Sequence, residues 1–223
     1  MPTEEWDRIA DRDGPRFEAV IERLERGEGP EDVARSTGLE PRSLVVAVAL
    51  DGLDRSDFGP NLVQEKPRRP PLRSALLATG LPTLFPHADR PRRLALAAGL
   101  LQVHDFWEES HHAAQEADDL GEANVSAYWH GIAHRREPDP GNALYWFRRV
   151  ARHPVFTQLA EAARLILETK DVDRKLIAKL LPRGIWDPIA FIEICSRERS
   201  LETIARHIQR EEMRLLLLAS IPS

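Results

Sequence analysis

The sequence has few of the features that mark secreted or membrane-spanning proteins. Its one cysteine, Cys195, has no partner for an internal disulfide, which fits a reducing compartment. The longest apolar runs, Leu44–Leu50 and Leu94–Leu101, are far shorter than the roughly 20 residues that a helix needs to cross a bilayer. The first residues, MPTEEWDRIADRDG, are acidic and lack an apolar core, so they do not read as a secretory signal. We therefore expect a cytoplasmic protein that does not enter a membrane.

Several motifs of known chemistry are also missing. The chain has no glycine-rich phosphate loop, no GxSxG turn for a nucleophilic serine and no paired cysteines for zinc. Its formal net charge of −5 argues against a general nucleic-acid binder. Alternating β-branched segments are absent, and helical periodicity fills most of the 223 residues. The sequence therefore predicts an all-α protein, long enough to bury a sizeable core.

Residues 1–54 are predicted to form a small acidic helical lobe. Ala34, Gly38 and Leu44 are spaced as in a helix-turn-helix. The second helix of that motif, PRSLVVAVAL, is apolar after its first residues and has nothing to hydrogen-bond to base edges. The lobe also carries fourteen acidic against seven basic side chains, a balance that repels phosphate. We expect this lobe to pack inward and to bind no nucleic acid.

The four prolines of residues 55–71 predict an extended, solvated linker, because proline removes backbone donors. Residues 72–223 are predicted to form the helical main domain. The last two helices have predicted caps at Asp187, which precedes Pro188, and at Ser200. After an apolar helix that follows Arg92, the predicted helices are 104–118, 125–135, 140–152, 156–168, 172–181, 187–198 and 200–219.

The centre of the chain resembles a tetratricopeptide repeat, a helix–turn–helix unit of about 34 residues. With Gly131 as the small residue where the two helices touch, Ala143 and Phe147 fall at the positions expected on the second helix. Gly99 lies in a more degenerate copy upstream. The resemblance implies stacked antiparallel helical hairpins, each covering its neighbour's apolar face.

Polar residues of the three central helices recur at helical spacing, so each helix carries them on one face. The short turn at Glu137–Pro140 makes the last two of these helices antiparallel, and we expect the three faces to converge on one pocket. The residues concerned are His104, Glu108, His111 and Gln115 on 104–118, His130 and His134 on 125–135, and Asn142, Tyr145, Trp146 and Arg149 on 140–152.

Metal binding is one interpretation of this set. His130 and His134 are one helical turn apart, as in many metal sites, and His111 with Glu108 completes a shell for a divalent ion. The HExxH order of zinc proteases is missing. The same histidines and Glu108 are candidate catalytic groups, because a histidine titrates near neutral pH.

Binding of an anionic small molecule is the interpretation that we place first. Arginine holds carboxylates and phosphates through two parallel hydrogen bonds, and a neighbouring histidine then serves as acid or base. The ligand-binding candidates are Gln115, Arg135, Arg136, Glu137, Asn142, Tyr145, Trp146 and Arg149.

A structural interpretation competes with both. Glu137 and Asp139 can pair with arginines, Asn142 can cap the following helix, and His134 can be a satisfied core residue. Glu212, among apolar residues of the last helix, is a further partner for an arginine. In that case the chain is a helical-repeat module that binds a protein partner, because such repeats present grooves to peptides.

The motif HRREPD, followed by NALYWFRR, resembles the signature of a family of bacterial proteins with distant fungal relatives and no assigned activity. The resemblance runs from about residue 95 to residue 217 and includes WDP at 186–188 and IQREEMRLLL at 208–217. It implies no substrate. It does imply that the histidines, arginines and aromatic residues of the central helices belong together, and it leaves the acidic lobe uncovered.

Overall fold

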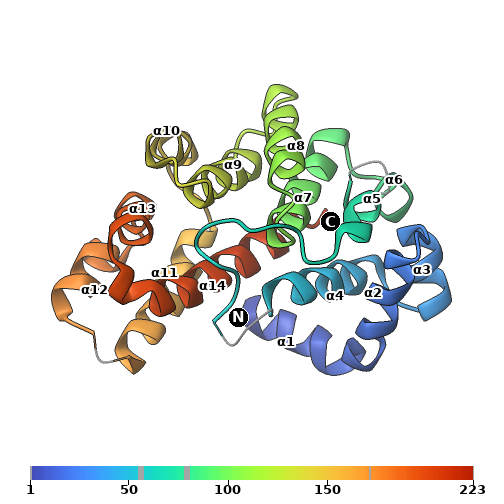
Figure 1. The fold of residues 1–223 in the computed structure, drawn as a ribbon, viewed down its shortest axis with the longest axis horizontal. Coiled ribbons are helices and arrows are strands. Elements are labelled where there is room, and N and C mark those ends of the chain that lie inside the picture. Colours follow the sequence, from blue (N-terminus) through green and yellow to red (C-terminus); the bar gives the residue numbers. More distant parts are fainter. Residues whose placement is uncertain (1, 55–57, 78–80, 171, 223) are drawn as a thin grey trace.

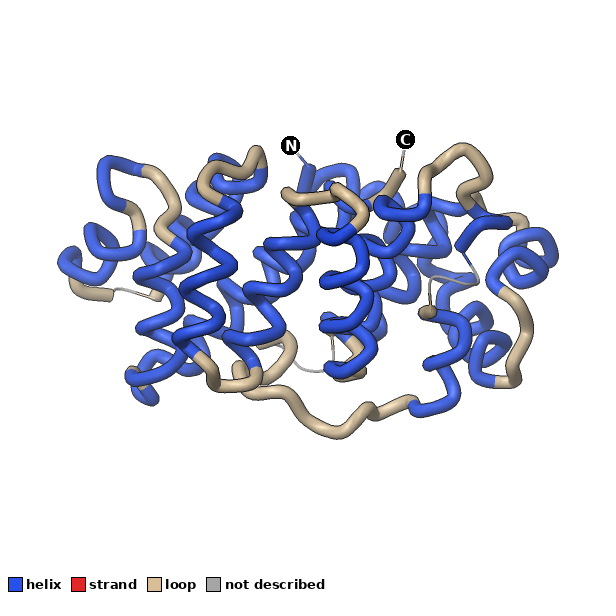
Figure 2. The backbone as a smooth tube through the Cα atoms, turned by 90° about the horizontal axis from the view of Figure 1, so that it is seen from above, coloured by secondary structure: helices blue, strands red, loops and turns tan. Residues whose placement is uncertain are grey.

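A computed structural model describes residues 2–54, 58–77, 81–170 and 172–222. All regular structure in these ranges is helical, and Figure 2 shows helices and loops without a strand. The all-α prediction is therefore confirmed. In the same ranges, no helix combines the length and the apolar character needed to cross a membrane.

Four helices form the N-terminal part: α1 (Pro2–Asp13), α2 (Phe17–Glu25), α3 (Pro30–Thr37) and α4 (Pro41–Leu53). Proline at the first helical position begins both α3 and α4, where its fixed φ suits a helix and its missing N–H costs nothing. Gly38 ends α3 with a φ of 65°, a left-handed conformation that glycine adopts without strain. The apolar α4 is buried along most of its length, as its sequence predicts.

The N-terminal helices share a core with the rest of the molecule. Helix α4 packs against both α7 (Arg90–Val103) and α14 (Glu202–Ser220), and the buried apolar side chains form one cluster from Trp6 to Ile221. At Gly52 the backbones come so close that an added Cβ would lie 2.8 Å from the carbonyl oxygen of Val103. The lobe predicted for residues 1–54 is thus part of a continuous interior.

The proline-rich segment is extended where it is described, but it is not a free linker. The Gln64 amide donates to the Arg136 carbonyl at 3.0 Å, and Arg136 Nε donates to the Asn61 carbonyl at 3.1 Å. Arg69 pairs with Glu25 and Asp51, both at 3.0 Å. The segment is therefore held at several points and buried at Gly59 and Pro60, although Val63, Glu65 and Lys66 are exposed as expected for a linker. Residues 55–57 lie outside the described residues. Short helices follow at η2 (Pro70–Leu72), α5 (Arg73–Leu76) and α6 (Leu81–Leu84).

Consecutive helices of the middle region pack on one another, α7 on α8, α8 on α9 and α9 on α10 (Figure 1). Glycines permit the close contacts, because an added Cβ would lie 2.6 Å from the Trp129 ring at Gly99 and 3.0 Å from the Phe147 ring at Gly131. Gly131 and Phe147 thus meet between two helices. The helices are α8 (Trp107–Asp119), α9 (Val125–Arg136) and α10 (Pro140–Val150).

The C-terminal helices are α11 (Val155–Thr169), α12 (Arg174–Leu180), α13 (Pro188–Arg197) and α14. The carboxylate of Asp187 accepts hydrogen bonds from the amides of Ile189 and Ala190, so the predicted cap of α13 is confirmed. The predicted cap at Ser200 is wrong. Ser200 lies in a short 3-10 turn, η5 (Arg199–Leu201), and α14 begins after Leu201 without a side-chain cap. Helix α14 runs through the middle of the molecule and packs against α11, α7 and α4.

Candidate functional site

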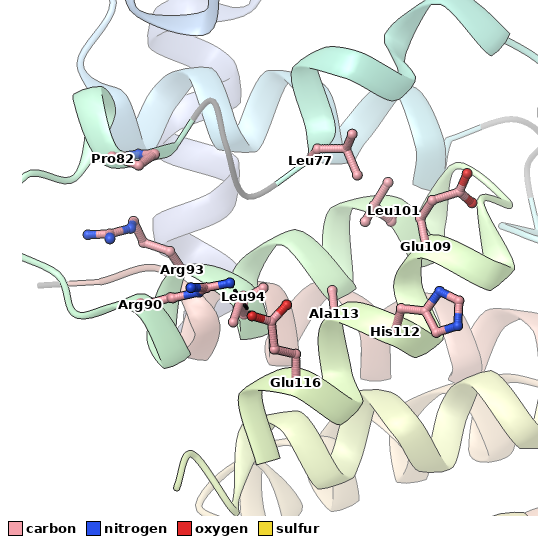
Figure 3. A pocket seen from close by; sticks show the side chains of 10 residues that line it. All are labelled: Leu77, Pro82, Arg90, Arg93, Leu94, Leu101, Glu109, His112, Ala113 and Glu116. Carbon is pink, nitrogen blue, oxygen red and sulfur yellow. Dashed lines mark hydrogen bonds and ion pairs between the residues drawn. The ribbon is translucent and has the colours of Figure 1, made fainter. Parts of the chain in front are cut away.

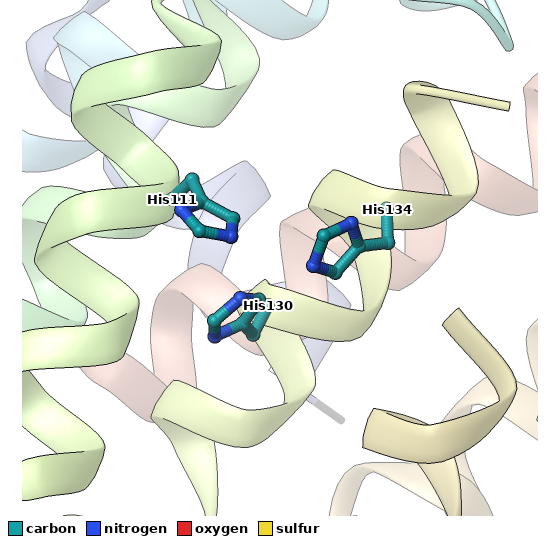
Figure 4. Close-up of side chains that lie close together, drawn as sticks. All are labelled: His111, His130 and His134. Carbon is teal, nitrogen blue, oxygen red and sulfur yellow. The ribbon is translucent and has the colours of Figure 1, made fainter. Parts of the chain in front are cut away.

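Three histidine side chains meet between α8 and α9. His130 and His134 lie one turn apart on α9 and are buried, and His111 reaches them from α8 and is half-buried. Figure 4 shows the three rings facing one another across the gap between the two helices. We refer to His111, His130 and His134 as the histidine trio.

The trio has the spacing of potential metal ligands. One ring nitrogen from each residue can be chosen so that all three atoms lie within 4.8 Å of one another. The ring centroid of His111 is 4.3 Å from that of His130 and 5.1 Å from that of His134. His130 and His134 are stacked with centroids 5.0 Å apart. The helical register that the sequence predicts for these three residues therefore places their rings together.

Hydrogen bonding leaves nitrogen lone pairs of the trio unused. Nδ1 of His134 lies 2.9 Å from Oε2 of Glu137. A carboxylate only accepts, so Nδ1 carries a hydrogen, and in the neutral ring Nε2 is the nitrogen with the lone pair. Figure 4 shows a nitrogen of His134 pointing toward the other two rings. Nδ1 of His130 is buried and has no hydrogen-bond partner, which is costly for a polar atom.

Two tryptophans hold the rings in place. Trp146 of α10 stacks on His130 at a centroid distance of 3.8 Å with the planes 14° apart. Trp107 of α8 stacks on His111 at 5.1 Å and donates from Nε1 to the Ala133 carbonyl at 3.0 Å. The trio therefore lies between two indoles, which restrict the rotamers of the histidines. Trp107 was missed in the sequence, although its position one turn before His111 was the available signal.

Burial favours the neutral form of His111 and His130. It lowers the pKa of His130 to about 3, and the neighbouring His111, His134 and Arg149 act in the same direction. Burial also lowers the pKa of His111 from its usual value, with His134 and His112 adding to the effect and Glu137 opposing it. Neutral imidazole is the form in which a histidine binds a metal.

The three candidate arginines all have carboxylate partners. Arg135 pairs with Glu212, with Nη1 3.1 Å from Oε1, and both side chains are fully buried. Arg136 pairs with Asp105 at 2.7 Å, also in the interior. The expectation that Glu212 binds an arginine is thus confirmed.

Arg149 differs from the other two arginines. Its side chain is exposed, pairs with Asp118 at 2.9 Å and lies 5.2 Å from the centroid of the Trp146 ring. Trp146 in turn stacks on His130, so Arg149 is the candidate arginine on the side of the trio that reaches solvent.

The remaining predicted residues are spread around this centre. Glu108 is exposed on α8, Gln115 donates to Asp119 at 2.9 Å, and Tyr145 is exposed with its ring edge-on to Trp146. Helix α10 is capped by Asp139, whose Oδ1 accepts from the Asn142 amide at 3.0 Å. The interpretation of Asn142 as the cap is therefore wrong. Its side chain instead donates to Asp139 at 2.7 Å.

His104 does not belong to the face of α8. Helix α8 begins at Trp107, and His104 follows the end of α7, where its Nε2 lies 2.9 Å from the Val48 carbonyl oxygen. The prediction of one stripe from His104 to Gln115 was wrong because a turn at Asp105, with a φ of 64°, separates the two helices.

A cavity of about 530 Å³ lies on another side of α8 (Figure 3). His112 lines it, although the adjacent His111 belongs to the trio. Ion pairs between Arg90 and Glu116 and between Arg73 and Glu109 border the cavity. The two neighbouring histidines of α8 thus have different surroundings, which makes His112 a natural control for His111.

No protein-family model matches the chain, and no curated protein or solved structure matches it either. The resemblance to the bacterial family with the HRREPD motif therefore stays a prediction.

Proposed function

We propose that the histidine trio binds a divalent transition metal such as zinc, and that the protein is a metal-dependent enzyme. The observation that carries this proposal is the set of three ring nitrogens within 4.8 Å of one another, each supplied by a buried or half-buried histidine. Imidazole is a preferred ligand of zinc, copper, iron and nickel.

The spacing supports a single ion. Three atoms no more than 4.8 Å apart all lie within about 2.8 Å of one common point, whereas zinc–nitrogen bonds are about 2.0–2.1 Å long. Ring rotations that move each nitrogen by less than about 1 Å would shorten these distances to the length of a zinc–nitrogen bond. No protein group bonds Nδ1 of His130. A bound ion would provide a partner for this nitrogen or, if the imidazole ring turns over, for Nε2.

Glu137 supports the same assignment as a residue of the outer shell. Histidines that bind metals commonly donate their second ring nitrogen to a carboxylate, which fixes the tautomer and makes the imidazole a better ligand. The contact of His134 with Glu137 has this form. The EPD part of the central motif would then serve the metal site through Glu137.

Three protein ligands leave a position for water, which is the arrangement of catalytic zinc sites. A metal lowers the pKa of its bound water toward neutrality and supplies hydroxide for hydrolysis. His111 is half-exposed, so the open position would be reached from its side. We therefore assign the chain to metal-dependent hydrolysis.

The substrate class in this proposal is a small anionic molecule, and Arg149 is its binding residue. Arg135 and Arg136 are fully buried with their carboxylate partners, whereas the guanidinium of Arg149 is exposed beside the nearly buried carboxylate of Asp118. A substrate anion would bind on the exposed side of this guanidinium without displacing Asp118, because both bonds to Asp118 come from Nη2 and arginine has five N–H donors. Tyr145, which is exposed beside Trp146 on the same helix as Arg149, is a second candidate to contact the substrate.

Titration of the metal-free protein with Co²⁺ tests the proposal, because cobalt bound by nitrogen ligands absorbs visible light. We expect one equivalent to bind, zinc to displace it, and His130→Ala to weaken binding at least about 100-fold. His112→Ala is the matched control and should bind like the wild type. Equal losses in both variants, or no binding at micromolar metal, would contradict the proposal.

A further inference from the structure

A second cavity, of about 670 Å³, lies away from the histidine trio. It is enclosed by the extended segment 61–65, the turn between α9 and α10, and residues from the end of α13 to the start of α14. Its volume falls within the range of about 300–1,000 Å³ that small-ligand pockets occupy. No residue of the trio lines it.

Two buried polar atoms of the lining residues lack hydrogen-bond partners. Arg135 is 4% exposed, and its Nε has no acceptor, although its terminal nitrogens reach Glu212. Gln64 also lines the cavity, and its Oε1 accepts no hydrogen bond. A buried donor or acceptor without a partner costs about 1–3 kcal/mol. One donor and one acceptor together match an amide, which offers one of each.

The charge of the cavity is negative. Glu65, Glu198 and Glu202 line it and are exposed, against the single exposed cation of Arg199. Arg135 adds no net charge because Glu212 neutralises it. Within the described residues, neither Glu198 nor Glu202 is engaged in an ion pair. These carboxylates are therefore free to receive a cationic group.

From these features we infer that the cavity binds a peptide segment of a partner protein that carries a lysine or arginine side chain. The basic side chain pairs with Glu198 and Glu202 at the rim. Because both atoms are buried, the lining side chains shift on binding, and the backbone amide of the same segment then supplies an acceptor to Arg135 and a donor to Gln64. Pro138 and Pro140 form an apolar wall for the aliphatic part of the basic side chain, as long cationic side chains commonly use.

Nuclear magnetic resonance with small capped residues tests this inference. The ligands are N-acetyl-lysine N-methylamide, its arginine counterpart and the uncharged norleucine analogue, each titrated into ¹⁵N-labelled protein to millimolar concentration. We expect the two basic ligands to shift amides of residues 61–65 and 195–202, and norleucine to shift them far less. A response that is equal for all three ligands, or absent from these residues, would overturn the inference.

Variants separate this cavity from the proposed metal site. The double substitution E198Q and E202Q should raise the dissociation constant of the lysine ligand about tenfold, since each exposed ion pair contributes up to about 1 kcal/mol. The matched control is E161Q with E168Q, two exposed carboxylates of α11 outside the cavity. His130→Ala should leave peptide binding unchanged. An equal effect of the α11 pair would show that only the overall negative charge attracts the ligand and would refute the site.

Discussion

At the scale of single residues, the trio owes its character to burial. His130 is packed between Trp146 and the other two rings, and no protein group bonds its Nδ1. The same packing that excludes water lowers the pKa values of His111 and His130 and holds the three rings at a fixed separation. Few rotamers are then left to select when an ion binds, which lowers the entropic penalty of binding.

We predict that Glu137→Gln weakens zinc binding about tenfold, within the range for residues that orient a metal ligand. The amide can still contact Nδ1 of His134, but it lacks the charge that raises the basicity of the ring. Competition against a chelator of known affinity measures the change. Glu161→Gln, an exposed substitution on α11, should leave the affinity unaltered. An unchanged affinity in Glu137→Gln would remove Glu137 from the outer shell.

A second prediction concerns acid stability and His153. Burial lowers the pKa of His153 to about 4, and its Nδ1 accepts a hydrogen bond from the Val155 amide, which requires the neutral ring. The unfolded chain, with a pKa near 6.5, binds the proton first. The neutral ring therefore stabilises the fold above about pH 6.5, and this contribution is lost as the pH falls toward about 4.

His153→Asn retains an acceptor and removes the titration. Its free energy of unfolding should fall less steeply with acidification than that of the wild type, by up to about 1.4 kcal/mol per pH unit in that window. Urea unfolding at pH 7, 6 and 5 measures both slopes. Parallel pH profiles for the two proteins would exclude His153 as a source of acid sensitivity.

At the scale of helices, glycine decides how closely the central elements approach. We predict that Gly99→Ala destabilises the protein by about 1–3 kcal/mol, because the new Cβ would overlap the buried Trp129 ring. Gly141→Ala is the matched control. Its Cβ would meet nothing closer than 3.4 Å, and alanine favours the helix by up to about 1 kcal/mol. Thermal unfolding of the two variants should therefore shift in opposite directions.

Helical periodicity was enough to predict the elements and the register of the trio. His111, His130 and His134 are each at positions where spacing along one helix determines the face. Periodicity did not predict which residue caps a helix or where a helix is interrupted. Asp139 caps α10 in place of Asn142, and Asp105 breaks the helix before Trp107 by taking a left-handed conformation. Periodicity also gives no partner for a charged group, so the ion pairs of Arg135 and Arg136 with distant chain segments could be only partly anticipated.

At the scale of the whole molecule, the N-terminal helices are needed to complete the interior. Composition separated an acidic lobe at 1–54 from the rest, because charge and proline content change there. Contacts across the chain are not visible in composition, and they join α4 to α7 and α14. Arg214 of α14 also reaches Asp7 of α1 in an ion pair.

We therefore predict that a chain lacking residues 1–54 does not unfold cooperatively. The deletion would uncover the faces of α7 and α14 that α4 covers, among them Val103. Dye binding measures the newly exposed apolar surface, and calorimetry measures the cooperativity of unfolding. A sharp thermal transition in the shortened chain would instead establish residues 1–54 as an independent lobe.

Helix α9 is buried from Ser126 to Arg136, and the extended segment is bonded to its end at the Arg136 carbonyl. A helix with no outward face has no local route to solvent, so its amide hydrogens exchange only when the entire chain opens. The exchange rate of α9 is then a direct gauge of global stability. Saturating zinc should slow these amides by the same factor by which it lowers the unfolded fraction, whereas the amides of exposed α12 should change little.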